Sequence, residues 1–504
     1  MKSALRHVFV ISALTLVGQL LGLATQITAA AIFGASIEMD AFLAAVSIPN
    51  YLVSIMLGSL SYVFLPFFVE HLSQDKKTEA YELAAFLLNN CLLAMSIISI
   101  LGILFAEKLL ILSAPGLNPE ARAIGTTVSL LTWPTLLAFG AFYVLIAVYQ
   151  AEKKFIWQAV VPLIGGLSSL LLTVFLANRY GIVSLAIGSG VSIILQVLLL
   201  SSVFLTPWRF KFSLGWYNTS LIQVVKLTIP LILVAAITKS TPIIDRFLAS
   251  DLDAGSISYL NYANKIVALL SALISTGGST VIFPKLAKDA AEANLNMLRD
   301  TLHKGVRLIW LAVAPVVAVG FVLAAPFSSV LLQHGRFSSA DVQSIVPLLA
   351  IYLFAAIGMC LGSVTAKGFY VLRDTKSLAV FGTLETLAYV IYIIPLTKKF
   401  GATGIAISGV LYFNLSIVWQ VILLNRKLGE AKYFAIFGCP VKILAAALLS
   451  AGAAAMILAM VEGDFNKVIW GSLISISTYF ITLKILKSNE IELLESALRQ
   501  RGEA

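Results

Sequence analysis

Apolar stretches long enough to cross a membrane follow one another along almost the whole chain. A transmembrane helix needs about 20 predominantly apolar residues. The composition agrees, because 59% of the 504 residues are hydrophobic and only 12% are charged, whereas soluble domains average about 25% charged residues. The chain is therefore predicted to be an all-α polytopic membrane protein. Soluble enzymes, nucleic-acid-binding proteins and disordered chains are excluded.

We expect about fourteen helical spans, because strands of a membrane barrel would alternate over about ten residues instead. The first apolar stretch is too long for the core of a signal peptide and is expected to be retained. The expected spans are residues 8–33, 41–69, 80–106, 124–149, 156–177, 182–206, 222–249, 257–283, 305–329, 343–366, 377–397, 402–425, 438–461 and 467–486.

Basic residues are distributed unevenly over the predicted loops. An even number of spans places both termini on one side, and that side collects 23 of the 35 Lys and Arg residues, against seven on the other. The excess of basic residues marks the cytoplasmic side, so both termini are predicted to be cytoplasmic. Loops that face anionic lipid explain the net charge of +10, and no nucleic acid is expected as a partner.

The chain resembles itself at a shift near 220 residues. Residues 180–188 match residues 400–408, residues 115–122 match residues 334–341, and Pro66 matches Pro284. Each repeat holds six spans, an even number, so both copies run in the same direction, as in several transporter folds. We therefore predict two six-helix lobes in parallel repeat, residues 1–215 and 216–430. Two further helices and a tail follow in residues 431–504.

Three ionisable residues fall inside predicted spans, where a charge costs at least a few kcal/mol. Lys239 and Lys265 lie about ten and eight residues from the ends of their spans, and Glu385 lies near the middle of the eleventh span. We interpret them as candidate binding residues for substrate or ion. The alternatives are an internal ion pair and a lysine stem that reaches toward the interface.

Further charged residues lie near span ends. Asp40 opens the second predicted span and could cap that helix, while Asp245 and Arg246 could anchor the seventh span at the interface. Asp40, Asp245 and Glu385 could also bind a coupling cation, Na⁺ or H⁺. No metal site is expected, because the three cysteines lie in separate spans and the four histidines are scattered. No Gly-Lys dipeptide is present, so the phosphate loop of ATP-driven transporters is not expected.

Helix-breaking residues interrupt several spans. They are Pro49, Pro134, Pro162, Pro230, Pro242, Pro315 and the pair Gly277-Gly278. Proline frees a backbone carbonyl and bends a helix, which suits a protein that opens alternately to two sides. The alternative is that proline and glycine are simply commoner in membrane helices.

Three stretches resemble the MurJ (MviN) family, which belongs to the multidrug, oligosaccharidyl-lipid and polysaccharide exporters. They are residues 40–50 (DAFLAAVSIPN), residues 244–265 and residues 334–341 (HGRFSSAD), joined by Leu21-Gly22 and Phe33-Gly34 near the start. The resemblance covers nearly the whole chain, in order and spacing. It implies fourteen helices in two lobes around a central cavity, with a groove for a lipid tail formed by the last two helices.

The residues of the resemblance are carried over only in part. Asp40 matches a family aspartate, and Lys265 stands where the family has an arginine, so the charge is kept without the bidentate guanidinium. Three further family arginines are replaced by Gln19, Thr25 and Val53, and a family glutamate is replaced by Ala268.

The resemblance implies a flippase rather than an enzyme, acting in peptidoglycan or cell-envelope biogenesis in the bacterial inner membrane. It would move a polyprenyl-pyrophosphate-linked glycan, lipid II or a related lipid, from the inner to the outer leaflet by alternating access. Lys265 and Lys239 are expected to attract the pyrophosphate, and Gln19, Thr25, Asn50 and Asn264 are expected to bind sugars. Besides this lipid and the membrane lipids, only a coupling cation is expected.

Other functions stay open at this point. The replaced arginines allow another polyprenyl-linked glycan, such as an exopolysaccharide or O-antigen unit. A cation-coupled drug antiporter of the same superfamily would centre on acidic residues. A membrane glycan polymerase or ligase would carry a long outer loop, and the predicted loops are short. A homologue that has become a scaffold is the last alternative.

Overall fold

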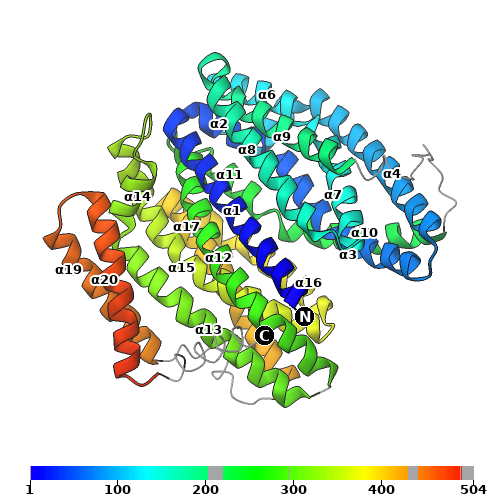
Figure 1. Cartoon of the computed structure of the whole chain (residues 1–504). Helices are drawn as coiled ribbons and strands as arrows, with labels where there is room; N and C mark the ends of the chain where they lie inside the picture. Colours follow the sequence, from blue (N-terminus) through cyan, green and yellow to red (C-terminus); the bar gives the residue numbers. More distant parts are fainter. Residues whose placement is uncertain (1, 202–218, 293, 430–440, 489, 491–504) are drawn as a thin grey trace. The chain divides into compact units, whose positions relative to one another are not determined.

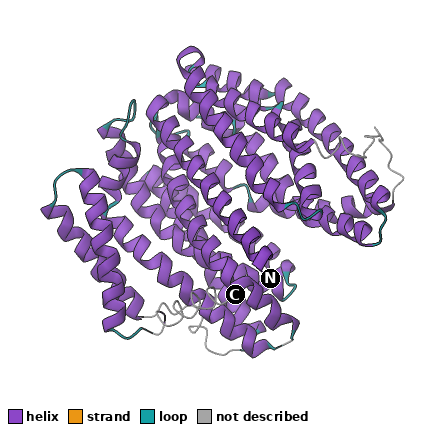
Figure 2. Ribbon diagram, in the orientation of Figure 1, coloured by secondary structure: helices purple, strands orange, loops and turns teal. Residues whose placement is uncertain are grey.

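The computed structural model describes residues 2–201, 219–292, 294–429, 441–488 and residue 490. Every regular element among these residues is a helix, and no strand occurs in them (Figure 2). The predicted all-α fold is confirmed.

Twelve helices begin before residue 258 (Figure 1). Three of them, α2, α5 and α11, have only eight or nine residues, and α12 is the longest with 36. They are α1 (Lys2–Phe33), α2 (Ile37–Ala45), α3 (Ser47–Ser73), α4 (Lys77–Leu104), α5 (Ala106–Ser113), α6 (Pro119–Thr132), α7 (Thr135–Ala151), α8 (Phe155–Tyr180), α9 (Val183–Ser201), α10 (Thr219–Thr238), α11 (Thr241–Ala249) and α12 (Ser256–Ala291).

The remaining described helices lie in the second half of the chain. They are α13 (Leu295–Val322), α14 (Ala324–Leu332), α15 (Ser339–Val371), α16 (Thr375–Phe400), α17 (Ala402–Lys427), α19 (Val441–Met460) and α20 (Asp464–Ile485). The last two pack side by side as a hairpin, drawn in orange and red in Figure 1.

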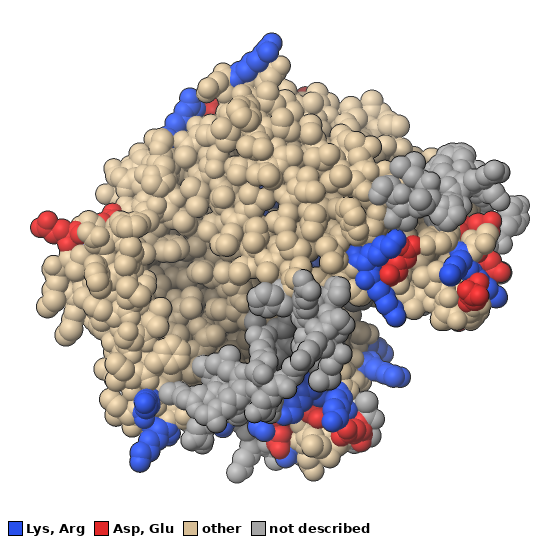
Figure 3. Space-filling model, viewed as in Figure 1, with Lys and Arg blue, Asp and Glu red and all other residues tan. Residues whose placement is uncertain are grey.

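Thirteen stretches of these helices are long and apolar enough to cross a membrane, and α6 with α7 makes a fourteenth if that bent pair is one span. The bend between α6 and α7 is 41°. Large apolar side chains on many of these helices are exposed, for example Phe175 at 76% and Ile391 at 75%. In the face drawn in Figure 3, most Lys, Arg, Asp and Glu side chains lie near the edges of the view, and most of the surface between them is formed by other residues. The protein is therefore a multi-pass membrane protein with its apolar side chains turned toward lipid.

The internal repeat is present in the backbone. Helices α8 and α16 both have 26 residues, and their bounds differ by a constant shift of 220. Both end at a glycine in the left-handed region, Gly181 with φ 54° and Gly401 with φ 58°. The turns that precede these helices also match, because Lys153 and Arg373 have φ of 61° and 56°. The sequence repeat therefore reflects two copies of one helical arrangement.

Proline explains where three of the spans break. A proline lacks the amide hydrogen that would bond to the carbonyl four residues earlier. Helix α2 ends at Ala45, four residues before Pro49, and α10 ends at Thr238, four residues before Pro242. Pro134 separates α6 from α7. Pro162, Pro230 and Pro315 lie inside unbroken helices, and Gly277 and Gly278 lie within α12. The expected interruptions therefore occur at three of the six prolines.

The chain forms two compact units, residues 1–258 (unit 1) and residues 259–504 (unit 2). Unit 1 has an apolar core around Phe64, Phe68, Leu83 and Leu136, all less than 2% exposed. The largest buried side chains of unit 2 include Tyr262, Phe337, Tyr389 and Tyr479. These two units are defined by their compactness and not by the sequence repeat. The lobe boundaries that the repeat predicts, near residues 215 and 430, therefore stay a prediction.

Candidate functional site

Two interrupted spans contact each other within unit 1. They are α2 with α3, which break at Val46, and α10 with α11, which break at Lys239 and Ser240. At the second break the amide of Ser240 bonds to Ile237 instead of Ala236, which leaves the Ala236 carbonyl without its helical donor. The Tyr51 hydroxyl of α3 donates to that carbonyl. Discontinuous helices of this kind form substrate and ion sites in transporters.

Asp40 lies in α2 and is 5% exposed. Its carboxylate accepts hydrogen bonds from the amides of Gly255 and Ser258, at 2.7 and 2.8 Å, and from the Ser258 hydroxyl at 2.5 Å. Ser258 lies in the first turn of α12, and Gly255 directly precedes that helix. Asp40 therefore caps a helix that is about 215 residues away in sequence.

The expectation that Asp40 caps its own helix is wrong, because Ser36 does so by accepting from the amide of Met39. Both carboxylate oxygens of Asp40 are engaged with α12, which explains how a membrane-embedded carboxylate is stabilised. Its role in substrate or cation binding stays a prediction.

Arg246 of α11 extends toward the break in the other interrupted span. Its Nη1 donates to the hydroxyl of Ser47 at 2.7 Å, and Ser47 is the first residue of α3 and 1% exposed. The arginine thus connects the two interrupted spans. The sequence suggested an interfacial anchor for Arg246, and the bond to Ser47 was missed because nothing in the sequence pairs residues 199 positions apart.

Six predicted site residues belong to unit 1. Lys239 and Asn50 are exposed, and Asp245 and Gln19 are partly exposed. The Thr25 hydroxyl donates to the Leu21 carbonyl of its own helix at 2.9 Å, as threonines in helices commonly do. Asp40 is the sixth.

Three predicted site residues belong to unit 2: Lys265, Asn264 and Glu385. Lys265 is exposed and Asn264 partly exposed, and both lie on α12. The two lysines expected to attract pyrophosphate, Lys239 and Lys265, therefore each have an accessible side chain, one in each unit.

Glu385 of α16 belongs to a chain of polar side chains in unit 2. One of its oxygens accepts from Trp419 Nε1 at 3.3 Å, and Ser416 is a further hydrogen-bond partner. The network continues from Gln420 Nε2 to Ser416 at 3.0 Å and from the Thr365 hydroxyl to Gln420 at 2.5 Å. The other oxygen, Oε1, is buried without a hydrogen-bond partner. A buried carboxylate oxygen with free acceptor capacity can take a proton or a cation.

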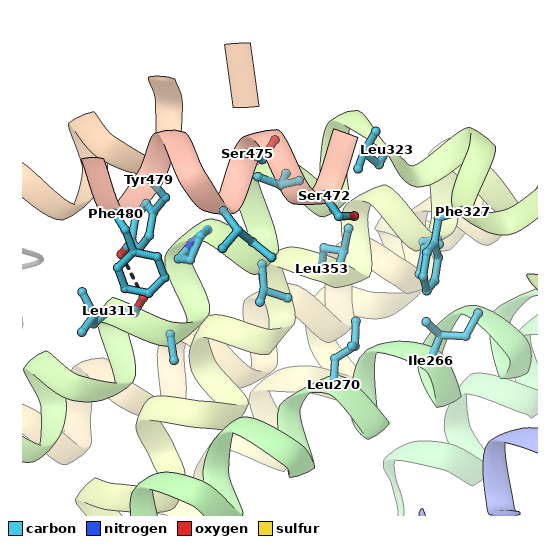
Figure 4. Close-up of a pocket in the computed structure, with 17 residues that line it drawn as sticks. Ile266, Leu270, Leu311, Leu323, Phe327, Leu353, Ser472, Ser475, Tyr479 and Phe480 are labelled. Carbon is cyan, nitrogen blue, oxygen red and sulfur yellow. Dashed lines mark hydrogen bonds between the residues drawn. The ribbon is translucent and has the colours of Figure 1, made fainter. Parts of the chain in front are cut away.

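Unit 2 also contains an apolar groove of about 380 Å³ (Figure 4). Residues of α20, α13, α12 and α15 line it, among them Phe480, Pro315, Leu270 and Leu353, and α14 contributes Phe327. The resemblance implied a groove formed by the last two helices; α20 lines this groove, and α19 contributes no lining residue. Helix α19 instead packs against α20 and supports it. The Ser475 hydroxyl of α20 donates to the Ser450 carbonyl of α19 at 2.9 Å.

One hydrogen bond holds α20 against α13 beside this groove. Pro315 cannot donate to the Leu311 carbonyl, four residues earlier, and the Tyr479 hydroxyl donates to it at 2.8 Å instead (Figure 4). Tyr479 is 2% exposed. An unpaired carbonyl in the membrane interior is costly. The Tyr479 hydroxyl therefore supplies the hydrogen-bond donor that Pro315 lacks.

No group of three or more His, Cys, Asp or Glu side chains that could hold a metal ion occurs among the described residues. Cys91 and Cys360 are buried, and Cys439 lies outside the described residues.

Comparison with solved structures gives the fold first. An inward-facing multidrug transporter of the MATE family, in the MOP superfamily, matches 82% of this chain and 94% of its own with a TM-score of 0.66, at 14% identity. A solved lipid II flippase MurJ in an inward closed conformation matches 96% of this chain and all of its own, with a TM-score of 0.83 and 22% identity. The chain thus shares its fold with both of these solved structures.

Sequence comparison then gives the family. The model of the family described as "Lipid II flippase MurJ" matches residues 29–477. A probable lipid II flippase MurJ of Buchnera aphidicola subsp. Acyrthosiphon pisum is 27% identical over 96% of this chain and 97% of its own. The lipid II flippase MurJ of Burkholderia cenocepacia is 26% identical over 74% of each chain. The chain belongs to the MurJ family, which confirms the resemblance.

Proposed function

We propose that this protein is a flippase that moves lipid II, or a closely related polyprenyl-pyrophosphate-linked glycan, from the inner to the outer leaflet of the bacterial inner membrane. The family match over residues 29–477 carries the proposal. The relatives named as lipid II flippases support it over nearly the full length of the chain. The protein is accordingly a transporter of the cell envelope and not an enzyme.

The polar head and the apolar tail of such a lipid need different surroundings, because a charged, sugar-rich head cannot enter hydrocarbon unaided. The apolar groove of unit 2 offers a dry surface for part of the tail, since Ser472, Ser475 and Tyr479 are its polar lining residues. Lys239 and Lys265 would attract the pyrophosphate. Gln19, Thr25, Asn50 and Asn264 would bind the sugars.

The direction of transport follows from charge. With the cell interior negative, outward movement of an anion is favoured by about 2.3 kcal/mol per charge per 100 mV. A coupling cation, Na⁺ or H⁺, would add to this drive. Glu385, with one unpartnered oxygen, is the described carboxylate best placed to bind it, and Asp245 and Asp40 are the other candidates. The two lobes would open alternately to the two sides, with both termini in the cytoplasm.

The direct test is rescue of cells depleted of their own lipid II flippase, together with movement of fluorescent lipid II in proteoliposomes. Wild type should support growth and flip lipid II. Lys265→Gln should reach the membrane and lose most flipping, with Lys304→Gln as a surface control. Normal flipping by Lys265→Gln would exclude the assigned role of Lys265. Failure of wild type with lipid II, but activity with an exopolysaccharide or O-antigen lipid, would select the alternative glycan.

A second experiment tests ion coupling. Flipping by wild type in proteoliposomes should depend on a Na⁺ or pH gradient, and Glu385→Gln should remove that dependence while keeping the hydrogen bond from Trp419. Glu462→Gln changes a carboxylate near a helix end and serves as the control. A gradient dependence that survives in Glu385→Gln would exclude Glu385 as the coupling site.

A further inference from the structure

The polar cluster of unit 2, formed by Glu385, Thr365, Ser416, Trp419 and Gln420, has almost no polar counterpart in unit 1. At the shift of 220 residues the corresponding positions hold, in the same order, Gly165, Leu145, Gln196, Leu199 and Leu200. Helices α8 and α16 nevertheless have the same length. The helical arrangement therefore does not depend on these polar side chains, and an ionisable residue kept among them at membrane depth points to a function.

The hydrogen bonds of this cluster run in one direction, toward the Glu385 carboxylate. An ionised carboxylate only accepts hydrogen bonds, so the Ser416 hydroxyl donates to Glu385 and accepts from Gln420 Nε2 at 3.0 Å. The Gln420 carbonyl oxygen then accepts from the Thr365 hydroxyl at 2.5 Å. Trp419 Nε1, which can only donate, bonds to the same carboxylate at 3.3 Å. The partners of Glu385 thus present hydrogens to it rather than lone pairs.

No basic side chain forms an ion pair with Glu385 in the part of the chain that the structure describes. The cations of the described ion pairs in unit 2 pair with other carboxylates, which are Glu292, Asp300, Glu490 and Asp374. From α17, Tyr412 interacts electrostatically with Glu385, and a tyrosine is uncharged at neutral pH. From α15, Thr365 belongs to the cluster, whereas Lys367 follows two residues later and points about 160° away around the helix. A carboxylate at membrane depth without a cationic side chain calls for a cation that is not part of the protein.

The cation that fits this site is a proton rather than a metal ion. A Na⁺ ion is held by several oxygen atoms, and transporters supply them largely as backbone carbonyls of unwound helices. Helices α15, α16 and α17 are continuous at Thr365, Glu385 and Ser416, so the carbonyls there are used within the helices. Pro395 frees the Ile391 carbonyl, but that carbonyl lies six residues beyond Glu385, about 9 Å of helical rise.

The acceptor for this proton is the Oε1 atom of Glu385. Oε1 is buried and has no hydrogen-bond partner, while Oε2 accepts from Trp419. A proton on Oε1 needs no further ligand, and it leaves the hydrogen bond to Oε2 in place. It also makes the side chain neutral, which lowers the cost of keeping it inside the membrane.

We propose that Glu385 carries the coupling ion as a proton on Oε1, and that its site does not take Na⁺. This inference rests on the proposed function, since it names the ion that was left open there. With the cell interior negative, inward movement of a proton and outward movement of an anionic lipid are both favoured. The exchange of one for the other therefore needs no ATP.

Trp419 allows a direct measurement on the purified full-length protein without any lipid substrate. Its indole donates to Glu385, so protonation of that carboxylate should change its fluorescence. We expect the emission of wild type to change with pH, and to stay constant when NaCl replaces choline chloride at fixed pH. Glu385→Gln and Trp419→Phe should remove the pH-dependent change. Glu462→Gln and Trp470→Phe should keep it and are the matched controls, because both residues are exposed and lie outside the cluster.

Flipping in proteoliposomes tests the same assignment by transport. A pH gradient, acidic on the side to which lipid II moves, should stimulate wild type severalfold, and a Na⁺ gradient at equal pH should not. Stimulation by Na⁺ at equal pH would overturn the proposal, as would identical pH-dependent emission of wild type and Glu385→Gln. If Glu385→Gln does not fold, wild type alone decides between the two gradients.

The two proposals fail in different ways. If wild type does not move lipid II but its emission changes with pH and this change disappears in Glu385→Gln, the substrate assignment is wrong and the proton site stands. If wild type moves lipid II and Glu385→Gln shows the same pH-dependent emission, the proton site is wrong and the function stands.

Discussion

The α8–α9 hairpin and the α16–α17 hairpin are repeats of one another, yet they place polar groups differently. Gly165 of α8 corresponds to Glu385 of α16, and Gln196 of α9 corresponds to Ser416 of α17, each at the shift of 220. In the first hairpin Gln196 fills the space over Gly165, where an added Cβ would come within 2.3 Å of its amide nitrogen. In the second hairpin the long side chain is a carboxylate on the other helix, next to the small Ser416.

The comparison shows which feature of the hairpin is the same in both copies of the repeat and which feature differs. The space between the two helices holds one long polar side chain in each half, because close packing leaves no room for two. Which helix supplies that side chain, and whether it is ionisable, is not fixed by the backbone. Only the second half has an acid there, so an ion-coupling function can be specific to that half.

Glycine and serine are also exchanged between α9 and α17, where these helices pack closely against α8 and α16. Substitutions at these glycines are expected to have the largest effect on the free energy of unfolding. Ser184 and Gly188 of α9 correspond to Gly404 and Ser408 of α17, so glycine and serine trade places one turn apart. A Cβ on Gly404 would lie 2.1 Å from the Leu396 carbonyl, whereas one on Gly188 would lie 2.8 Å from the Ser169 carbonyl. Both contacts are with backbone, which cannot move aside without shifting a helix.

We therefore expect Gly404→Ala to lower the free energy of unfolding by about 3 kcal/mol and Gly188→Ala by about 1 kcal/mol, in the range for overpacked sites. Thermal unfolding of the purified protein in detergent measures both, and Ser408→Ala serves as the control. Equal losses for the two glycine variants would contradict the difference drawn between the hairpins.

The second prediction concerns α13 and its repeat partner α4. Pro315 of α13 corresponds to Ile97 of α4, so only α13 has a proline-freed carbonyl that Tyr479 satisfies. Tyr479→Phe should lower the free energy of unfolding by about 2 kcal/mol, the cost of leaving a buried carbonyl unpaired. Adding Pro315→Ala should recover much of it, because the helix then pairs Leu311 itself. Ser477→Ala is the control on α20, and no recovery in the double variant would argue against this explanation.

The third prediction transplants one hairpin arrangement into the other. Glu385→Gly alone removes a long side chain and should cost about 2 kcal/mol through the cavity that it leaves. Glu385→Gly combined with Ser416→Gln rebuilds the first-half arrangement, and we expect about 1 kcal/mol to return. A double-mutant cycle measures this coupling. Strict additivity of the two changes would show that the exchange of long side chains is not what links these positions.

The smallest effect is expected at the turn before each hairpin. Asp374 accepts from the amide of Ser377 as the cap of α16 and pairs with Lys427 at 2.8 Å. Lys154 stands at the equivalent position before α8, where it makes no cap and pairs with Glu152 at 2.6 Å. The hydrogen bond from Lys427, with help from Ser377, lowers the pKa of Asp374 from its ordinary 3.8 to about 2.

Because the folded pKa is below the unfolded one, the ionised Asp374 stabilises the fold above about pH 4, and that contribution is lost as the pH falls toward 2. Asp374→Asn keeps a good cap and removes the ion pair, so it should cost less than 1 kcal/mol at pH 7. The difference from wild type should shrink as the pH is lowered below 4. Unfolding temperatures at pH 7 and at the lowest pH that the detergent sample tolerates test this, and a difference that stays constant would exclude the pair as its source.

Several features of the fold could be predicted from the sequence because their causes are local. Span length follows from the thickness of the bilayer, and the ends of α2 and α10 follow from Pro49 and Pro242 by the four-residue rule. The repeat was visible because glycine-ended turns leave a sequence pattern. The short helices α5 and α14 were not expected, since eight or nine residues carry too weak a periodic signal beside long apolar spans.

The site could be predicted only as a list of residue types. Charges inside spans identified Lys239, Lys265 and Glu385 as unusual, because any charge in hydrocarbon needs a reason. The tertiary structure alone decided the partners: Asp40 caps α12, Arg246 donates to Ser47, and Tyr479 donates to the Leu311 carbonyl of α13. These pairs are separated by 168 to 218 residues. No local propensity links such positions, and only the packing of one helix against another brings donor and acceptor within reach.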